Sequence, residues 1–438
     1  MRRHHSLQRQ LLPNGIVLVL AENPAADLVA GRIFLRRAGA CWDSLPKAGL
    51  SQLLATLMIK GTPSLSAQTV AETVESLGAH LGSEAASDYW VINLKTIAAD
   101  FPAILALATR LLREPAFPEE ELRLARRQTL QTLQSQRSQP FNVAFQQLRQ
   151  AMYPDHPYGL SLLGTETSLP QITRQDLLDY HQAYFRPDNF VVSLSGHFDS
   201  EGMAALVEKT FQDWPVPVQS LICPQWPSLV SAPKTCATAH NSQQSVVMVG
   251  YLAPGVKSAD YAPLKLINTY LGAGLSSRLF VQLREKQGLA YDVSAFYPTR
   301  LQSSQLVMYL GTAPEKTALA LGELLREAER LTEESLSSGE LDAAKNKLLG
   351  QYALGKQTNG EIAHLFGWYE ALGLGVDFDE TFPEQIRALT AAEIQSAAQR
   401  YLRHPYLSLA GPAEFVEPLG SDQPLGNSEE IKFSGRDN

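Results

Sequence analysis

Five prolines within residues 211–235 divide this 438-residue chain into two parts of similar length. Because proline lacks a backbone N–H and has a fixed φ, a stretch this rich in proline cannot continue a helix or pair within a sheet. It therefore predicts an ordered, extended linker. A chain of this length also exceeds what one hydrophobic core usually holds. We expect two domains, residues 1–212 and 237–438, joined by a linker of residues 213–236.

The second part repeats the first in outline, at an offset of about 210 residues. Strand and helix patterns recur in pairs: residues 32–37 with 246–251, 89–94 with 305–310, and 101–112 with 316–330. Strands that come partly in adjacent pairs, mixed with helices, favour an α+β fold over a regular βαβ alternation. A duplicated α+β architecture is the economical explanation.

Local patterns predict several elements of the first part. Alternating or continuous apolar residues indicate strands, whereas apolar spacing of three to four residues indicates helices. The predicted strands are residues 15–20, 28–35, 89–95 and 190–195, and the predicted helices are residues 66–77, 101–112, 119 to about 152, and 173–184.

The segment from Gly49 to Thr62 reads GLSQLLATLMIKGT. It resembles the inverzincin signature of pitrilysin- and insulinase-type metallopeptidases, which typically reads G-x-x-H-x-x-E-H and ends in K-G-T. In that family the two histidines bind zinc and the glutamate is the catalytic base. This chain has Gln52, Ala55 and Thr56 at those three positions. An amide, a methyl group and a hydroxyl cannot build a His₂Glu zinc site or hold a general base.

The resemblance also implies a third zinc ligand, a glutamate roughly 75 residues further along the chain. That position lies near Thr132, and no acidic residue occurs between Glu121 and Asp155. We therefore expect that this chain binds no zinc and no other cofactor, and that it is not a metallopeptidase on its own.

A second motif lies in the other half, where residues 283–291 read LREKQGLAY. It is similar to the C-terminal-domain motif of the same family, in which an Arg and a Tyr seven residues apart reach toward the zinc-bound substrate. Arg284 and Tyr291 have that spacing. A guanidinium and a phenol donate hydrogen bonds that stabilise a carbonyl oxygen as it gains negative charge. The resemblance implies that Arg284 and Tyr291 bind substrate.

Composition excludes several other classes of function. A net charge of −8 and an isoelectric point near 5.7 argue against nucleic acid as the main partner. Three cysteines without a CxxC pair give no disulfide framework. The N-terminus lacks the apolar region of a secretory signal, and no apolar run reaches the ~20 residues of a membrane span. We expect a cytoplasmic protein. Glu361 and His364, three residues apart, are interpreted as an ordinary polar pair or a core-edge histidine.

The resemblance covers nearly the whole chain and implies two homologous α+β domains of the LuxS and processing-peptidase metalloenzyme type, forming a clamshell. Relatives of this size resemble mitochondrial processing peptidase and its bacterial relatives, which can assemble from two unlike subunits. The expected role is the non-catalytic partner of an HxxEH-bearing zinc paralogue, with zinc in that paralogue only. An extended peptide is the expected substrate. Two alternatives stay open: a structural assembly subunit, and a homodimeric module that binds peptides without cleaving them.

Overall fold

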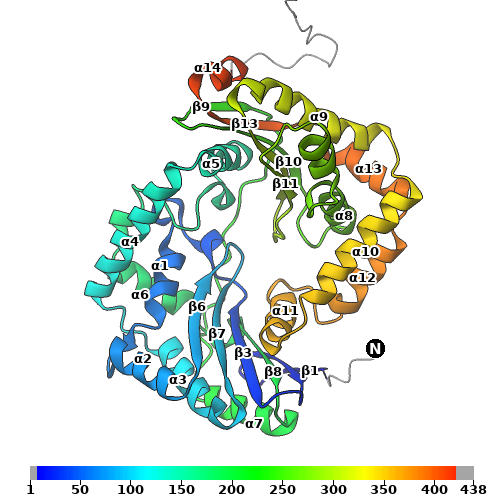
Figure 1. Cartoon of the computed structure of the whole chain (residues 1–438). Helices are drawn as coiled ribbons and strands as arrows, with labels where there is room; N and C mark the ends of the chain where they lie inside the picture. Colours follow the sequence, from blue (N-terminus) through cyan, green and yellow to red (C-terminus); the bar gives the residue numbers. More distant parts are fainter. Residues whose placement is uncertain (1–6, 421–438) are drawn as a thin grey trace, which may run out of the picture.

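The computed structural model describes residues 7–420, which form two α+β domains (Figure 1). In the first domain, a six-stranded sheet has the order β1-β2-β8-β3-β7-β6. Its strands are β1 (Leu7–Leu11), β2 (Val17–Glu22), β3 (Leu28–Leu35), β6 (His80–Ala85), β7 (Trp90–Ile97) and β8 (Phe190–Gly196). Strands β4 (Gly61–Thr62) and β5 (Leu65–Ser66) form a separate short hairpin. The helices are α1 (Leu50–Met58), α2 (Ala67–Ser76), α3 (Phe101–Arg113), α4 (Glu119–Arg137), α5 (Pro140–Met152), α6 (Arg174–Tyr184) and α7 (Ser200–Phe211).

The second domain has a five-stranded sheet of order β11-β12-β10-β13-β9. Its strands are β9 (Thr235–Ala239), β10 (Ser245–Ala253), β11 (Asp292–Phe296), β12 (Ser304–Thr312) and β13 (Tyr406–Gly411). The helices are α8 (Tyr261–Gly272), α9 (Thr317–Glu333), α10 (Ser338–Leu354), α11 (Asn359–Ala371), α12 (Phe378–Ala388), α13 (Ala391–Tyr401) and α14 (Ala413–Val416). No described helix has both the length and the apolar character that a membrane crossing requires.

The two sheets share one topology, so the predicted duplication and α+β class are confirmed. Strands β6, β7, β3, β8 and β2 occupy the same order as β11, β12, β10, β13 and β9. The pairings also agree in direction: each series is antiparallel except for its last pair, β8 with β2 and β13 with β9, which is parallel. Strand β1 is the one addition in the first sheet.

The predicted single helix from residue 119 to about 152 is wrong, because the chain breaks between α4 and α5. Gln139 is extended, with φ −108° and ψ 117°, and Pro140 is the first residue of α5. A proline disfavours the helical conformation of the residue before it but fits well at the first position of a new helix. The break allows α5 to run in a different direction from α4.

The break carries α5 onto the sheet of the second domain, where it packs on β10, β13 and β9 (Figure 1). Ser408 of β13 donates a hydrogen bond to the carbonyl of Ala144 at 2.8 Å. A side chain at Gly250 of β10 would lie 2.9 Å from the Met152 sulfur. The glycine thus permits the close approach of helix and strand.

In return, α11 of the second domain packs on β3, β8 and β2 of the first sheet, the strands equivalent to β10, β13 and β9 (Figure 1). A Cβ at Gly367 would lie 2.5 Å from the Phe34 ring and 2.8 Å from Ser193 Cβ, so the helix sits directly on the sheet. Arg9 of β1 pairs with Glu370 at 2.9 Å. Each domain therefore supplies a helix that covers the other domain's sheet.

The segment between α7 and β9 contains no helix or strand and is held at several points along its length. Arg186 donates to the carbonyls of Gln219 at 2.6 Å and Pro217 at 3.0 Å. Trp226 packs edge-on against Trp42, with ring centroids 5.4 Å apart, and Ala232 donates to the hydroxyl of Tyr406. These contacts order the segment without regular structure.

Candidate functional site

Helix α1 carries the degenerate zinc motif, and Asp43 fixes its start. The Asp43 carboxylate accepts hydrogen bonds from the backbone N–H groups of Gly49 and Ser51, both at 3.1 Å, and from the Ser51 hydroxyl. Burial raises the pKa of Asp43 to about 7 despite these donors. Gly49 has φ 94°, and a side chain there would meet the Leu163 carbonyl at 2.7 Å. The motif's first glycine is thus required by backbone geometry.

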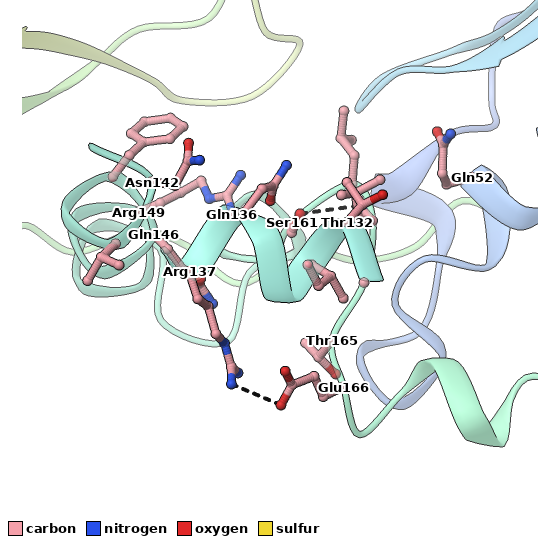
Figure 2. Close-up of a pocket in the computed structure, with 16 residues that line it drawn as sticks. Gln52, Thr132, Gln136, Arg137, Asn142, Gln146, Arg149, Ser161, Thr165 and Glu166 are labelled. Atoms are coloured by element: carbon pink, nitrogen blue, oxygen red, sulfur yellow. Dashed lines mark hydrogen bonds and ion pairs between the residues drawn. The ribbon is translucent and has the colours of Figure 1, made fainter. Parts of the chain in front are cut away.

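A cavity beside α1 is lined by Gln52 and Thr132, two of the four positions that correspond to the family's zinc ligands and catalytic base (Figure 2). Its volume is about 470 Å³. Gln52 comes from α1, Thr132 comes from α4 together with three further lining residues, and the remaining wall comes from α5 and the loop of residues 161–166. Two residues 80 positions apart in the sequence therefore face one space, where the family resemblance places the first and third zinc ligands.

The other two positions do not line this cavity. Ala55 is buried in the first-domain core, and its carbonyl accepts a hydrogen bond from the Ser83 hydroxyl of β6. Thr56 is exposed, and its hydroxyl donates to the carbonyl of Gln52 at 3.1 Å. Thr132 makes the same local bond to the carbonyl of Gln128.

The side chains at this place do not fit a zinc ion. Zinc in proteins takes Cys, His, Asp or Glu, and the four positions offer an amide, a methyl group and two hydroxyls that already donate to their own helices. Within residues 7–420, no group of three or more such metal-binding side chains comes together. The chemistry available at these four positions is hydrogen bonding by neutral groups.

One cation in this cavity was not predicted from the sequence. Arg149 of α5 is largely buried, and its Nε has no hydrogen-bond partner among residues 7–420. Figure 2 shows its side chain extending from α5 toward Gln136 of α4. At another part of the wall, Arg137 forms an ion pair with Glu166 at 3.0 Å. The cavity therefore holds one paired and one unpaired guanidinium.

Arg284 and Tyr291 lie in the second domain and do not line this cavity. Both side chains are exposed, Tyr291 to 61%. The Arg284 guanidinium lies 5.0 Å from the Phe280 ring centroid. Residues Phe280–Lys286 form a π-helix, a rare geometry that occurs frequently at functional sites. Tyr291 immediately precedes β11, and its backbone N–H donates to the carbonyl of Gly311 in β12. The substrate-binding role of the two residues stays a prediction.

Glu361 and His364 do not form a pair. Glu361 closes the capping box at the start of α11, where its carboxylate accepts from the backbone and hydroxyl of Thr358. His364 packs edge-on against Phe34, with ring centroids 5.3 Å apart, and contacts Tyr89. Burial lowers the pKa of His364 to about 4, with a smaller contribution from the Arg32 charge. The interpretation of His364 as a core-edge histidine is confirmed.

Two family models match the chain in succession. Residues 17–166 match the model described as insulinase, peptidase family M16. Residues 171–348 match the model described as peptidase M16 inactive domain. Together they include both the α1 motif and the segment of Arg284 and Tyr291.

Curated relatives align over nearly the whole chain. An uncharacterized zinc protease of Mycobacterium tuberculosis is 25% identical over 421 residues, which cover 95% of this chain and 94% of the relative. An uncharacterized zinc protease of Bacillus subtilis is 24% identical, with 93% of this chain and 98% of the relative covered.

Solved structures share the fold. A protease from Helicobacter pylori superposes with a TM-score of 0.87 at 20% identity, over 93% of this chain and all of that one. A structure from Pseudomonas fluorescens, described as a peptidase M16 inactive domain, superposes with a TM-score of 0.85 at 24% identity, over 93% of this chain and 98% of that one.

Proposed function

Because the chain belongs to the insulinase family of peptidases, family M16, we propose that it is the non-catalytic partner of a zinc-bearing member of that family. The observation that carries the proposal is the chemistry of one site: the motif helix, its cap and its cavity are present, yet Gln52 and Thr132 replace the residues that would bind zinc. The zinc and the general base would come from the partner subunit.

Arg284 and Tyr291 are the residues that this chain would contribute to a shared site. Their exposure leaves both side chains available to a ligand, and the π-helix that carries Arg284 supports a functional role. A guanidinium and a phenol can donate to a peptide carbonyl and stabilise its oxygen as charge develops there. Arg284 and Tyr291 would act through this electrostatic stabilisation and would transfer no proton.

The peptide would bind in extended form along β6. Strand β6 lies at the edge of the first sheet and pairs with β7 on one side only among the described strands. An exposed edge can add a peptide as a further strand through main-chain hydrogen bonds. Ser83 of β6 bonds to Ala55 of α1, so this edge runs beside the motif helix.

The test is cleavage of an unstructured fluorogenic peptide by this chain, by an HxxEH-bearing paralogue from the same genome, and by the two mixed. We expect activity in the mixture that exceeds that of either protein alone and that a chelator abolishes. Loss of an oxyanion donor typically lowers kcat by about 100-fold or more, so Arg284→Ala and Tyr291→Phe should lower the activity of the mixture on that scale.

Arg403→Ala, which removes an exposed arginine elsewhere in the second domain, is the matched control. Full activity of the Arg284 and Tyr291 variants would remove these residues from the site while leaving the partnership intact. Absence of any gain on mixing, with stable self-association of this chain, would favour a structural or peptide-capturing role instead.

A further inference from the structure

Arg149 is a largely buried cation for which the described residues provide no counter-ion. Its Nε is buried without a hydrogen-bond partner, and none of the ion pairs in residues 7–420 includes it. Its guanidinium carbon lies 5.3 Å from the centroid of the Phe145 ring. A cation over a phenylalanine ring recovers only part of the solvation that burial removes.

The surroundings make the positive charge less favourable still. Burial, with a smaller contribution from the charge of Arg300, lowers the pKa of Arg149 to about 10. The acidic side chain in the same cavity, Glu166, already pairs with Arg137 at 3.0 Å. Arg149 therefore remains protonated at neutral pH and has no anion of its own beside it.

The rest of the cavity provides neutral hydrogen-bonding groups. Its polar wall consists of side-chain amides and hydroxyls: Gln52, Thr132, Gln136, Asn142, Gln146, Ser161 and Thr165. Amides can donate to a carboxylate and can also bind a peptide main chain, since each has both a donor and an acceptor. Figure 2 places Gln136 and Asn142 on the same side of the cavity as the Arg149 head.

We infer that this cavity binds a carboxylate of an extended peptide, with Arg149 as the charged partner and the neighbouring amides as further donors. A guanidinium offers two parallel N–H groups that match the two oxygens of a carboxylate. The cavity where the family resemblance places two of the zinc ligands would thus bind an anionic group in this chain. The inference rests on the proposed function only in taking a peptide as the ligand.

The carboxylate has two possible sources, the peptide's C-terminus or an Asp or Glu side chain. Four fluorescein-labelled peptides of one unstructured sequence separate them: each has a free or an amidated C-terminus, and Glu or Gln at one internal position. Binding to this chain alone is measured by fluorescence anisotropy. We expect at least one carboxylate to strengthen binding roughly tenfold or more relative to the amidated Gln peptide.

Arg149→Met should abolish the difference among the four peptides, because it removes the charge and keeps the bulk of the side chain. Arg149→Lys should retain only part of the difference, since an ammonium lacks the planar pair of donors. The matched control is Arg127→Met, an exposed arginine of α4 outside the cavity, which should retain the full difference.

Thermal unfolding without peptide separates a binding role from a structural one. If Arg149 serves a ligand, Arg149→Met relieves an unpaired buried charge, and Tm should stay the same or rise. A Tm several degrees lower, or equal binding of all four peptides by the natural chain, would overturn the inference. Equal binding would do so even where mixing with the paralogue produces activity, so the two proposals fail separately.

Discussion

At the scale of single residues, two histidines make the stability of the folded chain depend on pH. Burial lowers the pKa of both His156 and His364 to about 4. A histidine with a lowered folded-state pKa binds its proton more readily in the unfolded chain. The free energy of unfolding therefore falls as pH drops from about 6.5 toward about 4. Asp43 has the opposite effect on the free energy of unfolding. Because its pKa is raised to about 7 in the folded chain, the protonated carboxyl adds stability at low pH, and this stability is lost as pH rises through about 7.

Because these contributions oppose one another, the prediction concerns a single variant measured against the natural chain. His364→Phe keeps an aromatic ring between Phe34 and Tyr89 but removes the titrating group. The loss of stability between pH 6.5 and pH 4.5, measured by urea unfolding, should shrink by about 2 kcal/mol. His404→Phe, at an exposed position, is the control. An unchanged loss in the His364 variant would contradict the prediction.

Some residues of the site can be identified from a sequence motif, whereas others can be identified only from the folded structure. Gln52 and Thr132 stand where a family pattern expects ligands, so their chemistry could be assessed from the sequence. Asp43 caps α1 from an irregular loop, and no spacing rule links it to Gly49 and Ser51. Arg149 is informative because it lacks a partner in space, and a sequence does not show whether a charge is paired.

At the scale of elements, apolar periodicity located several helices and strands. The predicted strand of residues 28–35 is β3, and the predicted helix of residues 173–184 is α6 with Thr173 as its cap. The error lay at Pro140, where the apolar spacing continues through a change of direction. Periodicity reports which face of a helix is buried but does not say against which sheet, so the crossing of α5 and α11 to opposite domains was not predictable.

Because α11 packs closely on the first sheet, we expect a side chain at Gly367 to lower the stability of the molecule. Gly367→Ala places a methyl group 2.5 Å from the Phe34 ring and 2.8 Å from Ser193 Cβ. Both neighbours belong to buried strands and have little room to move away. We expect a loss of about 2–3 kcal/mol in the free energy of unfolding by urea. Hydrogen exchange should show faster exchange of the α11 amides.

Gly350→Ala is the matched control for Gly367→Ala. Gly350 is an exposed helical glycine of α10, and a Cβ there meets no atom within 4 Å. Alanine should stabilise it by about 0.5–1 kcal/mol, because glycine has the lower helix propensity. Equal effects of the two substitutions would show that α11 does not rest on the sheet in this way.

At the scale of the whole molecule, the two domains are joined by more than the linker. Helix α5 contributes Leu148 and Met152 to a core that also includes Val246 and Met248 of β10. Helix α11 contributes Ala371 to the cluster on the first sheet. Each domain therefore completes its apolar surface only with a helix from the other. Such an exchange favours one fixed arrangement of the two halves over free opening about the linker.

This exchange predicts how the chain behaves when divided. A protein of residues 1–212 lacks α11 and exposes the apolar face of its sheet, namely Val17, Val19, Phe34, Val91 and Val191. A protein of residues 213–438 lacks α5 in the same way. We expect each half alone to aggregate or to bind a dye for exposed apolar surface, because a contiguous patch of this kind is unstable in water. Coexpressed halves should copurify as one complex.

Cleavage of the intact chain separates the role of the linker from that of the exchange. A protease site inserted between the exposed residues Pro227 and Ser228 lies in a segment without helix or strand. After cleavage, the two pieces should elute together in gel filtration, with a Tm close to that of the uncut chain, because α5 and α11 stay in place. Dissociation on cleavage would mean that the linker alone holds the halves together, and the reciprocal packing of α5 and α11 would then contribute little to the stability of the molecule.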